Sequence, residues 1–208
     1  MEDIFRNILK TTGADPVIVF GDLLTYIISG FCLNEEKVAW KYKKDVNKLF
    51  FNMTIAWMER CSDEIEKEGW SDALGKFYEQ NIINNGKQVN FQQYYTPKEV
   101  SSLAARILVT ENTKVNTFNE PSCGSGRNLL CFARTHRDSY YVGEDVDSTS
   151  CRICICNFFI HRIQGLVICH NTLSGNPVHF AYATNPYIMD STSPYYGIPH
   201  ILREYDDT

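Results

Sequence analysis

The sequence predicts an α/β fold in which a helical N-terminal region precedes a mainly parallel β-sheet. Three observations predict it. Residues 116–126 read as a short apolar strand that ends in an acid and enters a turn with two glycines. From residue 97 onward, segments with helix and strand character alternate, as they do in a parallel sheet covered by helices. Residues 1–86 instead show apolar side chains at spacings of three and four, which indicates helices.

The N-terminal region is expected to hold several helices. Asp15 and Pro16 predict a helix start, because proline at the first position loses no hydrogen bond, and a largely buried helix follows over residues 17–31. A longer helix should follow from residue 34, with apolar side chains at helical spacing at Val38, Tyr42, Val46, Leu49, Phe50, Met53 and Trp57. A third amphipathic helix covers Ser71 to Ile83.

We place a domain boundary near residue 86, where Asn84, Asn85 and Gly86 can form a left-handed helix cap. This divides the chain into a helical domain at 1–86 and a sheet domain at 87–208. The expected order in the sheet domain is helix 97–109, strand 115–119, helix 127–137, strand 140–144, helix 149–163, strand 166–170 and strand 178–184.

The composition is that of a soluble globular protein. The chain has 208 residues, of which 44% are hydrophobic and 22% charged. The N-terminus lacks the basic and apolar regions of a signal peptide. The longest apolar stretch, Val17 to Phe31, is interrupted by Gly21, Asp22 and Gly30 and is too short and polar to span a bilayer. We therefore expect a cytoplasmic protein without a membrane partner.

The formal net charge of −5 argues against strong nonspecific DNA binding by the chain alone. It leaves room for a local basic patch or a basic partner subunit. A run of lysines lies on the longer N-terminal helix pattern and reads either as a solvated helix face or as a phosphate contact: Lys37, Lys41, Lys43, Lys44 and Lys48.

Eight cysteines are spread through segments with helix and strand character. Their only cluster is Cys151, Cys154 and Cys156, and no second pair at zinc-ligand spacing accompanies it. The pattern favours buried reduced thiols over a metal or redox site, so we expect no metal.

Four further stretches carry polar groups at positions suited to ligand binding. They are residues 93–97 before the first helix of the sheet domain, 141–147, 170–173 and 185–187. Asp145 lies about 20 residues beyond the glycine turn, where a carboxylate can accept hydrogen bonds from ribose hydroxyls. The glycine turn and the last three stretches follow predicted strands. We expect them to meet at the carboxyl edge, where open parallel sheets bind ligands.

This set resembles the amino-type DNA methyltransferases that use S-adenosylmethionine, and most of all the adenine-N6 methylating subunits of type I restriction–modification systems and their relatives. Tyr-Thr-Pro at 95–97 and Glu-Pro-Ser-Cys-Gly-Ser-Gly at 120–126 carry the resemblance, which is most specific over 93–187 and extends over about the whole chain. A dehydrogenase would place a third glycine near Leu129. The resemblance implies a Rossmann-like methyltransferase sheet after a helical domain, S-adenosylmethionine as cofactor, and DNA as substrate, with a separate specificity subunit.

The resemblance also assigns cofactor contacts. Tyr95, Thr96 and Pro97 match the stretch that closes over the methionine end of the cofactor. Glu120 matches the acid that meets its ammonium group. The turn that passes beneath the cofactor is matched by Cys123, Gly124 and Gly126.

Two further positions match the nucleoside end of the cofactor. Asp145 matches the acid that binds the ribose. Asn171 stands where the family usually has the aspartate that accepts from the adenine amino group, and its amide oxygen can still accept. Without the other elements, Glu120 or Asp145 would read as a solvated strand end.

The resemblance assigns the chemistry to Asn185, Pro186 and Tyr187. In the family, the asparagine oxygen and the proline carbonyl accept hydrogen bonds from the target amino group, and an aromatic ring stacks on the flipped base. The family's second proline is absent here, so Tyr187 stands one position early. Taken alone, the three residues would read as a simple turn.

Residues 188–208 leave room for one more strand, near 198–202. A complete methyltransferase sheet and a base-reading region do not both fit there, so we expect a partner to supply DNA recognition. Three functions stay open. They are adenine-N6 DNA methylation in a restriction–modification type system, a catalytically impaired S-adenosylmethionine-binding subunit or regulatory module, and methylation of RNA, protein or a small molecule.

Overall fold

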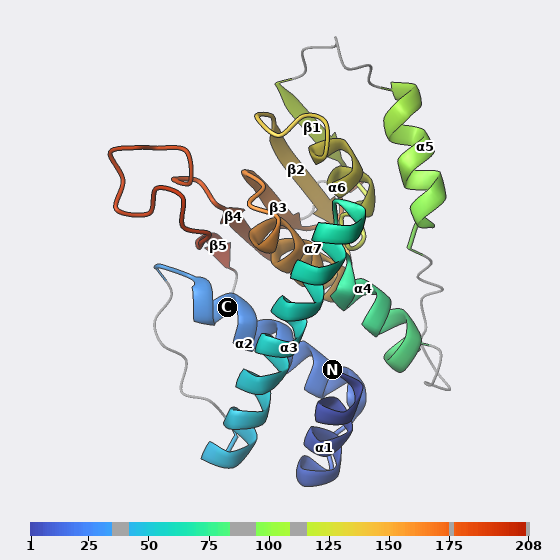
Figure 1. The fold of residues 1–208 in the computed structure, drawn as a ribbon, viewed down its shortest axis with the longest axis vertical. Helices are drawn as coiled ribbons and strands as arrows, with labels where there is room; N and C mark the ends of the chain where they lie inside the picture. The colour runs from blue at the N-terminus through green and yellow to red at the C-terminus, as the bar shows by residue number, and fades with distance from the viewer. Residues whose placement is uncertain (35–41, 84–94, 109–115, 175–176, 207–208) are drawn as a thin grey trace.

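The protein is a five-stranded β-sheet with helices packed against it (Figure 1). The computed structural model describes residues 1–34, 42–83, 95–108, 116–174 and 177–206. The helices are α1 Glu2–Thr12, α2 Pro16–Phe31, α3 Lys44–Glu68, α4 Ala73–Tyr78, the π-helix η1 Glu79–Ile83, α5 Lys98–Leu108, α6 Arg127–Ala133 and α7 Ser148–Ile160. The strands are β1 Thr117–Glu120, β2 Tyr140–Asp145, β3 Gly165–Cys169, β4 Phe180–Thr184 and β5 Ile201–Asp206.

The strands follow one another across the sheet in the order β1-β2-β3-β4-β5. β1, β2 and β3 are parallel, whereas β4 runs antiparallel to β3 and β5 antiparallel to β4. The prediction of a mainly parallel sheet is therefore wrong beyond β3, because the sheet is mixed. The cause is the connection. Only residues 170–179 join β3 to β4, and a parallel crossover needs about a dozen residues or more.

The helix starts follow local capping chemistry. Asp15 caps α2 by accepting from the backbone N–H of Val17 at 2.8 Å, and Pro16 occupies the first turn, as predicted. α3 begins at Lys44, and the earlier part of the expected helix, residues 35–41, lies outside the described residues. The third expected helix consists of α4 followed by η1.

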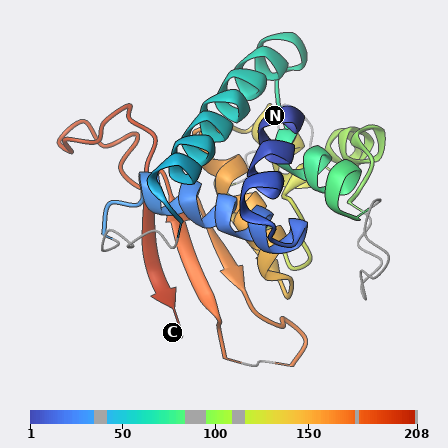
Figure 2. The same ribbon diagram turned by 90° about the horizontal axis from the view of Figure 1, so that it is seen from below.

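One apolar core joins the helical region to the sheet. α7 packs on β2 and β3, and α2 packs on α7, where the rings of Phe31 and Phe159 lie 4.4 Å apart between centroids. Figure 2 shows α1 to α3 on the same side of the sheet as α7. The expected domain boundary near residue 86 lies outside the described residues, so the division into 1–86 and 87–208 stays a prediction.

No single helix in the described part of the chain is long and apolar enough to cross a membrane. Among the described helices, α1 and α2 taken together reach that length and hydropathy, and they are bent by 113°.

Candidate functional site

The carboxyl ends of the three parallel strands meet at one edge of the sheet. The backbone N–H of Cys123 donates to the carbonyl of Glu144 at 2.9 Å, which joins the turn after β1 to β2. The hydroxyl of Thr172 donates to the carbonyl of Pro121 at 3.3 Å, which brings in the loop after β3. The stretches around Glu120, Asp145 and Asn171 therefore lie together, as predicted.

The turn after β1 is held by the carboxylate of Asp145. One oxygen accepts from the N–H of Gly124 at 2.8 Å and the other from the N–H of Asp147 at 2.9 Å. Gly124 and Gly126 have φ values of 54° and 85°. A Cβ on Gly126 would lie 2.8 Å from the Sγ of Cys154, so only glycine fits there. Each Asp145 oxygen keeps a lone pair that can accept from a hydroxyl.

Thiols line the buried side of this turn. A Cβ on Gly143 would lie 3.2 Å from the Sγ of Cys123 and 3.3 Å from that of Cys154. All eight cysteines are free thiols, and burial raises the pKa of Cys154 well above its ordinary value. Among the described residues, no group of three or more histidine, cysteine or acidic side chains could hold a metal ion.

Tyr95 covers the turn from the other side. A Cβ on Gly124 would lie 3.0 Å from its ring, and its hydroxyl lies 3.0 Å from that of Ser150 on α7. The carbonyl of Thr96 accepts from the Arg127 guanidinium at 3.3 Å. Pro97 directly precedes α5. The structure thus brings the start of the 95–97 stretch to the glycine turn, whereas residues 93 and 94 lie outside the described part.

Glu120 ends β1 with a half-satisfied carboxylate. Its Oε1 accepts from the amide of Asn128 at 2.5 Å, whereas its Oε2 is buried and has no hydrogen-bond partner among the described residues. Burial raises the pKa of Glu120 to about 7, and the charge of Asp145 adds to the effect. An unpaired carboxylate oxygen in this position suits a ligand that brings a cationic donor.

This raised pKa makes a prediction for stability. The folded protein keeps a proton on Glu120 that the unfolded chain loses near its ordinary pKa of 4.5, so stability falls as the pH rises from there to about 7. Glu120→Gln removes that loss. Between pH 4.5 and 7.5 we expect the unfolding free energy of the variant to gain about 2–3 kcal/mol relative to the parent, measured by urea denaturation. A difference in unfolding free energy between variant and parent that does not change with pH would contradict this prediction. Glu99→Gln, exposed on α5, is the control.

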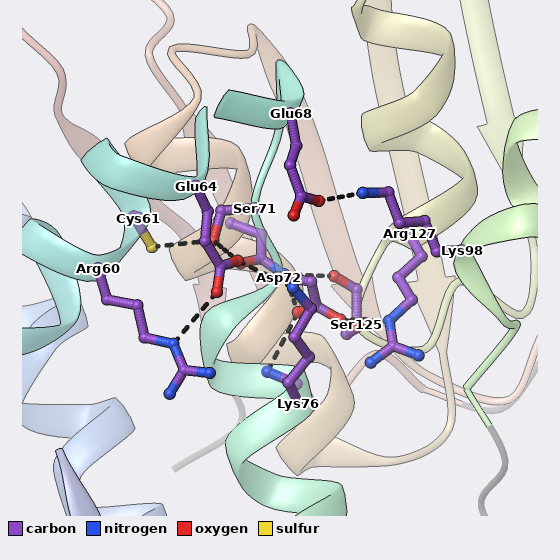
Figure 3. A network of polar contacts seen from close by, with 12 residues as sticks. Arg60, Cys61, Glu64, Glu68, Ser71, Asp72, Lys76, Lys98, Ser125 and Arg127 are labelled. Carbon is purple, nitrogen blue, oxygen red and sulfur yellow. Dashed lines mark hydrogen bonds and ion pairs between the residues drawn. The ribbon is translucent and has the colours of Figure 1, made fainter. Parts of the chain in front are cut away.

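A buried polar cluster centred on Asp72 contacts the glycine turn through Ser125 (Figure 3). Asp72 is fully buried and accepts from four groups: the N–H of Gly75 at 3.1 Å, the hydroxyl of Ser125 at 2.8 Å, Nε of Arg127 at 2.5 Å and the amide of Asn157 at 2.8 Å. Burial raises the pKa of Asp72. All four contacts nevertheless donate to it, so the ionised form is the one that satisfies both oxygens.

Arg127 extends the cluster toward the N-terminal region. Its Nη2 lies 2.6 Å from the carboxylate of Glu79 in η1. Asn157 also donates to the carbonyl of Ser125 at 2.8 Å. Together these contacts tie α4, η1, the glycine turn and α7 to one another. No local pattern predicts this cluster, because Asp72 before an apolar run indicates only a helix cap.

The loop after β3 is shaped by Asn171. Its Oδ1 accepts from the N–H of Leu173 at 3.0 Å and so closes a turn on itself. Beside it, Nε2 of His170 lies 2.5 Å from the carboxylate of Glu144. Asn171 is therefore at the predicted edge, with its amide oxygen already accepting one hydrogen bond.

The predicted catalytic loop lies at the other edge of the sheet. Because β4 is antiparallel to β3, its last residue Thr184 pairs with Gly165, the first residue of β3. The prediction that all four strand ends meet is therefore wrong for residues 185–187. They do not join Glu120 and Asp145.

Asn185 is fully buried and makes structural hydrogen bonds. With φ at 54°, its amide group donates to the carbonyls of Phe158 at 3.1 Å and Ile163 at 3.0 Å, and its Oδ1 accepts from the N–H of His200 at 3.0 Å. Tyr187 is 40% exposed and stacks on His200, with the ring centroids 5.5 Å apart. In this arrangement the acceptor oxygen of Asn185 is occupied by the backbone.

The comparisons with known proteins agree with the resemblance. A family model described as N-6 DNA Methylase matches residues 70–197. The chain is 33% identical over 112 residues to the Type I restriction enzyme MpnII methylase subunit of Mycoplasma pneumoniae. That match covers 49% of this chain and 20% of the relative, so the chain spans about a fifth of that protein's length. No solved structure matches the chain.

Proposed function

The chain belongs to the N-6 DNA methylase family, and from that premise we propose that it binds S-adenosylmethionine for adenine-N6 methylation of DNA in a restriction–modification type system. The observation that carries this is the edge formed by β1, β2 and β3. There a glycine turn, a carboxylate held by that turn and a buried carboxylate oxygen without a donor lie together. We further propose that β1 to β3 form the cofactor half of a Rossmann-like methyltransferase sheet.

The residues at this edge suit the cofactor's polar groups. S-adenosylmethionine supplies a methyl group on a positively charged sulfur. The unpaired Oε2 of Glu120 accepts from the ammonium group, and the carboxylate of Asp145 accepts from the ribose hydroxyls. Tyr95, packed on Gly124, excludes water from the turn. The amide oxygen of Asn171 accepts from the adenine amino group.

Asn185 and Pro186 are the proposed acceptors for the target amino group, but their place favours a second candidate function. Asn185 lies at the opposite edge of the sheet from Glu120, and its amide is used by the backbone. In this arrangement the chain binds the cofactor without turnover, as a subunit or regulatory module. Methyl transfer then depends on segments like those that the Mycoplasma pneumoniae relative has outside the matched part, or on a specificity partner.

Calorimetric titration with S-adenosylmethionine tests the cofactor site. We expect Asp145→Asn to weaken binding at least about tenfold, because it removes the charge and one acceptor and turns an amide NH2 toward the backbone N–H of Gly124 or Asp147. We also expect the parent to bind more weakly below pH 7, where Glu120 holds a proton. Asp63→Asn, exposed on α3, is the matched control and should bind like the parent. No binding by the folded parent would contradict both candidate functions.

Methyl transfer from labelled S-adenosylmethionine to unmethylated DNA separates the two candidates. Label in N6-methyladenine with the chain alone would establish the first. Cofactor binding without label would favour the second. Label in RNA but not in DNA would contradict the DNA substrate.

A further inference from the structure

A pocket of about 610 Å³ opens at the edge of the sheet opposite Glu120 and Asp145. Its walls come from the segment after α6, which leads into β2, from the end of α7, which leads into β3, and from the loop between β4 and β5. Because β1 to β3 are parallel, the starts of these strands lie far from the carboxyl edge that would hold the cofactor. The pocket is thus separate from the proposed cofactor site.

Three arginines line the pocket: Arg134, Arg137 and Arg162. Within the described residues none of them forms an ion pair, and Asp138 is the one acidic side chain in the lining. His161 also lines the pocket, but burial lowers its pKa to about 4, so it is neutral at pH 7. The pocket is therefore cationic in a chain whose net charge is −5.

The rest of the lining is apolar and aromatic. Met189 is 67% exposed and Tyr196 is 56% exposed, and both line the pocket with Ile188. Guanidinium groups bind phosphate through paired hydrogen bonds, whereas an exposed tyrosine ring offers a face for a planar base. The volume is that of a small-ligand site, large enough for one nucleotide. The lining thus matches both parts of a nucleotide rather than a bare anion.

The pocket adjoins the predicted catalytic loop. Gln164 lines it and donates from its amide to the carbonyl of Pro186 at 3.2 Å. We propose that this pocket binds one nucleotide of a DNA strand, with the backbone phosphate on Arg134, Arg137 and Arg162 and the base against Tyr196. The inference rests on the proposed function, which makes DNA the substrate. It gives this acidic chain a DNA contact of its own.

Binding of a fluorescently labelled single-stranded deoxyoligonucleotide, without cofactor and over a series of salt concentrations, tests the proposal. We expect Arg137→Gln/Arg162→Gln to weaken binding at least about tenfold at low salt. The slope of log K against log salt should become shallower by up to about 0.7, which is the contribution of the one phosphate that the pocket holds. Tyr196→Leu should weaken binding about fivefold or more and leave the slope unchanged.

The matched control is Lys10→Gln/Arg106→Gln on α1 and α5, which removes the same charge from two exposed positions outside the pocket lining. Equal losses of oligonucleotide affinity in the two double variants would contradict the proposed nucleotide site, because they would indicate general electrostatic attraction. Unchanged binding in the arginine variant would also overturn it. A ribo-oligonucleotide of the same sequence that binds about tenfold more tightly would contradict the assignment to DNA.

A parallel titration with S-adenosylmethionine separates this proposal from the proposed function. The arginine variant should bind the cofactor like the parent, since its changes lie at the other edge of the sheet. A parent that binds the oligonucleotide through the arginines but does not bind the cofactor would contradict the proposed function alone. A parent that binds the cofactor but not the oligonucleotide would contradict the pocket alone.

Discussion

Asp72→Ala is expected to lower the free energy of unfolding by about 3–5 kcal/mol. The change leaves the guanidinium of Arg127, the hydroxyl of Ser125 and the amide of Asn157 without their shared acceptor in the interior. Arg127 keeps Glu79 as an ion-pair partner, but its Nε and the other two donors lose their acceptor and cannot regain water without opening the fold. Urea denaturation followed by tryptophan fluorescence measures the loss.

Two further variants locate the cause of this loss. Asp63→Ala, exposed on α3, should change the unfolding free energy by less than about 0.5 kcal/mol. Asp72→Asn should give an intermediate loss, because its amide nitrogen must face at least one of the four donors. A loss below about 1 kcal/mol for Asp72→Ala would show that the buried cluster does not hold the turn.

Asn185→Ala is expected to cost about 3 kcal/mol of stability, whatever its effect on methyl transfer. The change leaves the buried N–H of His200 without its acceptor and removes one of the donors to each of the carbonyls of Phe158 and Ile163. Alanine must also adopt the left-handed backbone at φ 54°, which costs about 1 kcal/mol. Thermal and urea unfolding of the variant and the parent measure the effect.

Asn185→Gly separates the two causes, because glycine accepts the left-handed backbone but makes none of the side-chain hydrogen bonds. Asn119→Ala, exposed on β1, is the control and should unfold like the parent. If Asn185→Ala unfolds at the parent's urea midpoint, the buried role is wrong. Any loss of methyl transfer in an Asn185 variant has to be normalised to the folded fraction.

Features that depend on nearby residues could be predicted from the sequence. The cap at Asp15 and the first turn at Pro16 need only local hydrogen bonds. The turn at 124–126 was predictable because left-handed backbone favours glycine. The meeting of Glu120 with Asp145 follows from parallel pairing of two strands joined by a helix. These features agree in prediction and structure because each is decided within one strand–helix–strand unit.

Features that depend on the whole chain could not be predicted in the same way. The strand at β4 is recognisable from its apolar residues, but its direction is decided by the short connection 170–179 and by pairing with β5. The role of Asp72 depends on Asn157, which lies 85 positions later. The same holds for the buried oxygen of Glu120, because burial is a property of the assembled edge.

The thiols beneath the glycine turn give this site a built-in chemical reporter. Cys154 is fully buried under Gly126, and burial keeps its pKa high, so little reactive thiolate forms in the closed protein. An alkylating reagent can reach it only when the turn separates from α7. The rate at which Cys154 is alkylated in the native protein therefore measures how often the glycine turn separates from α7. A ligand bound on the turn slows that rate.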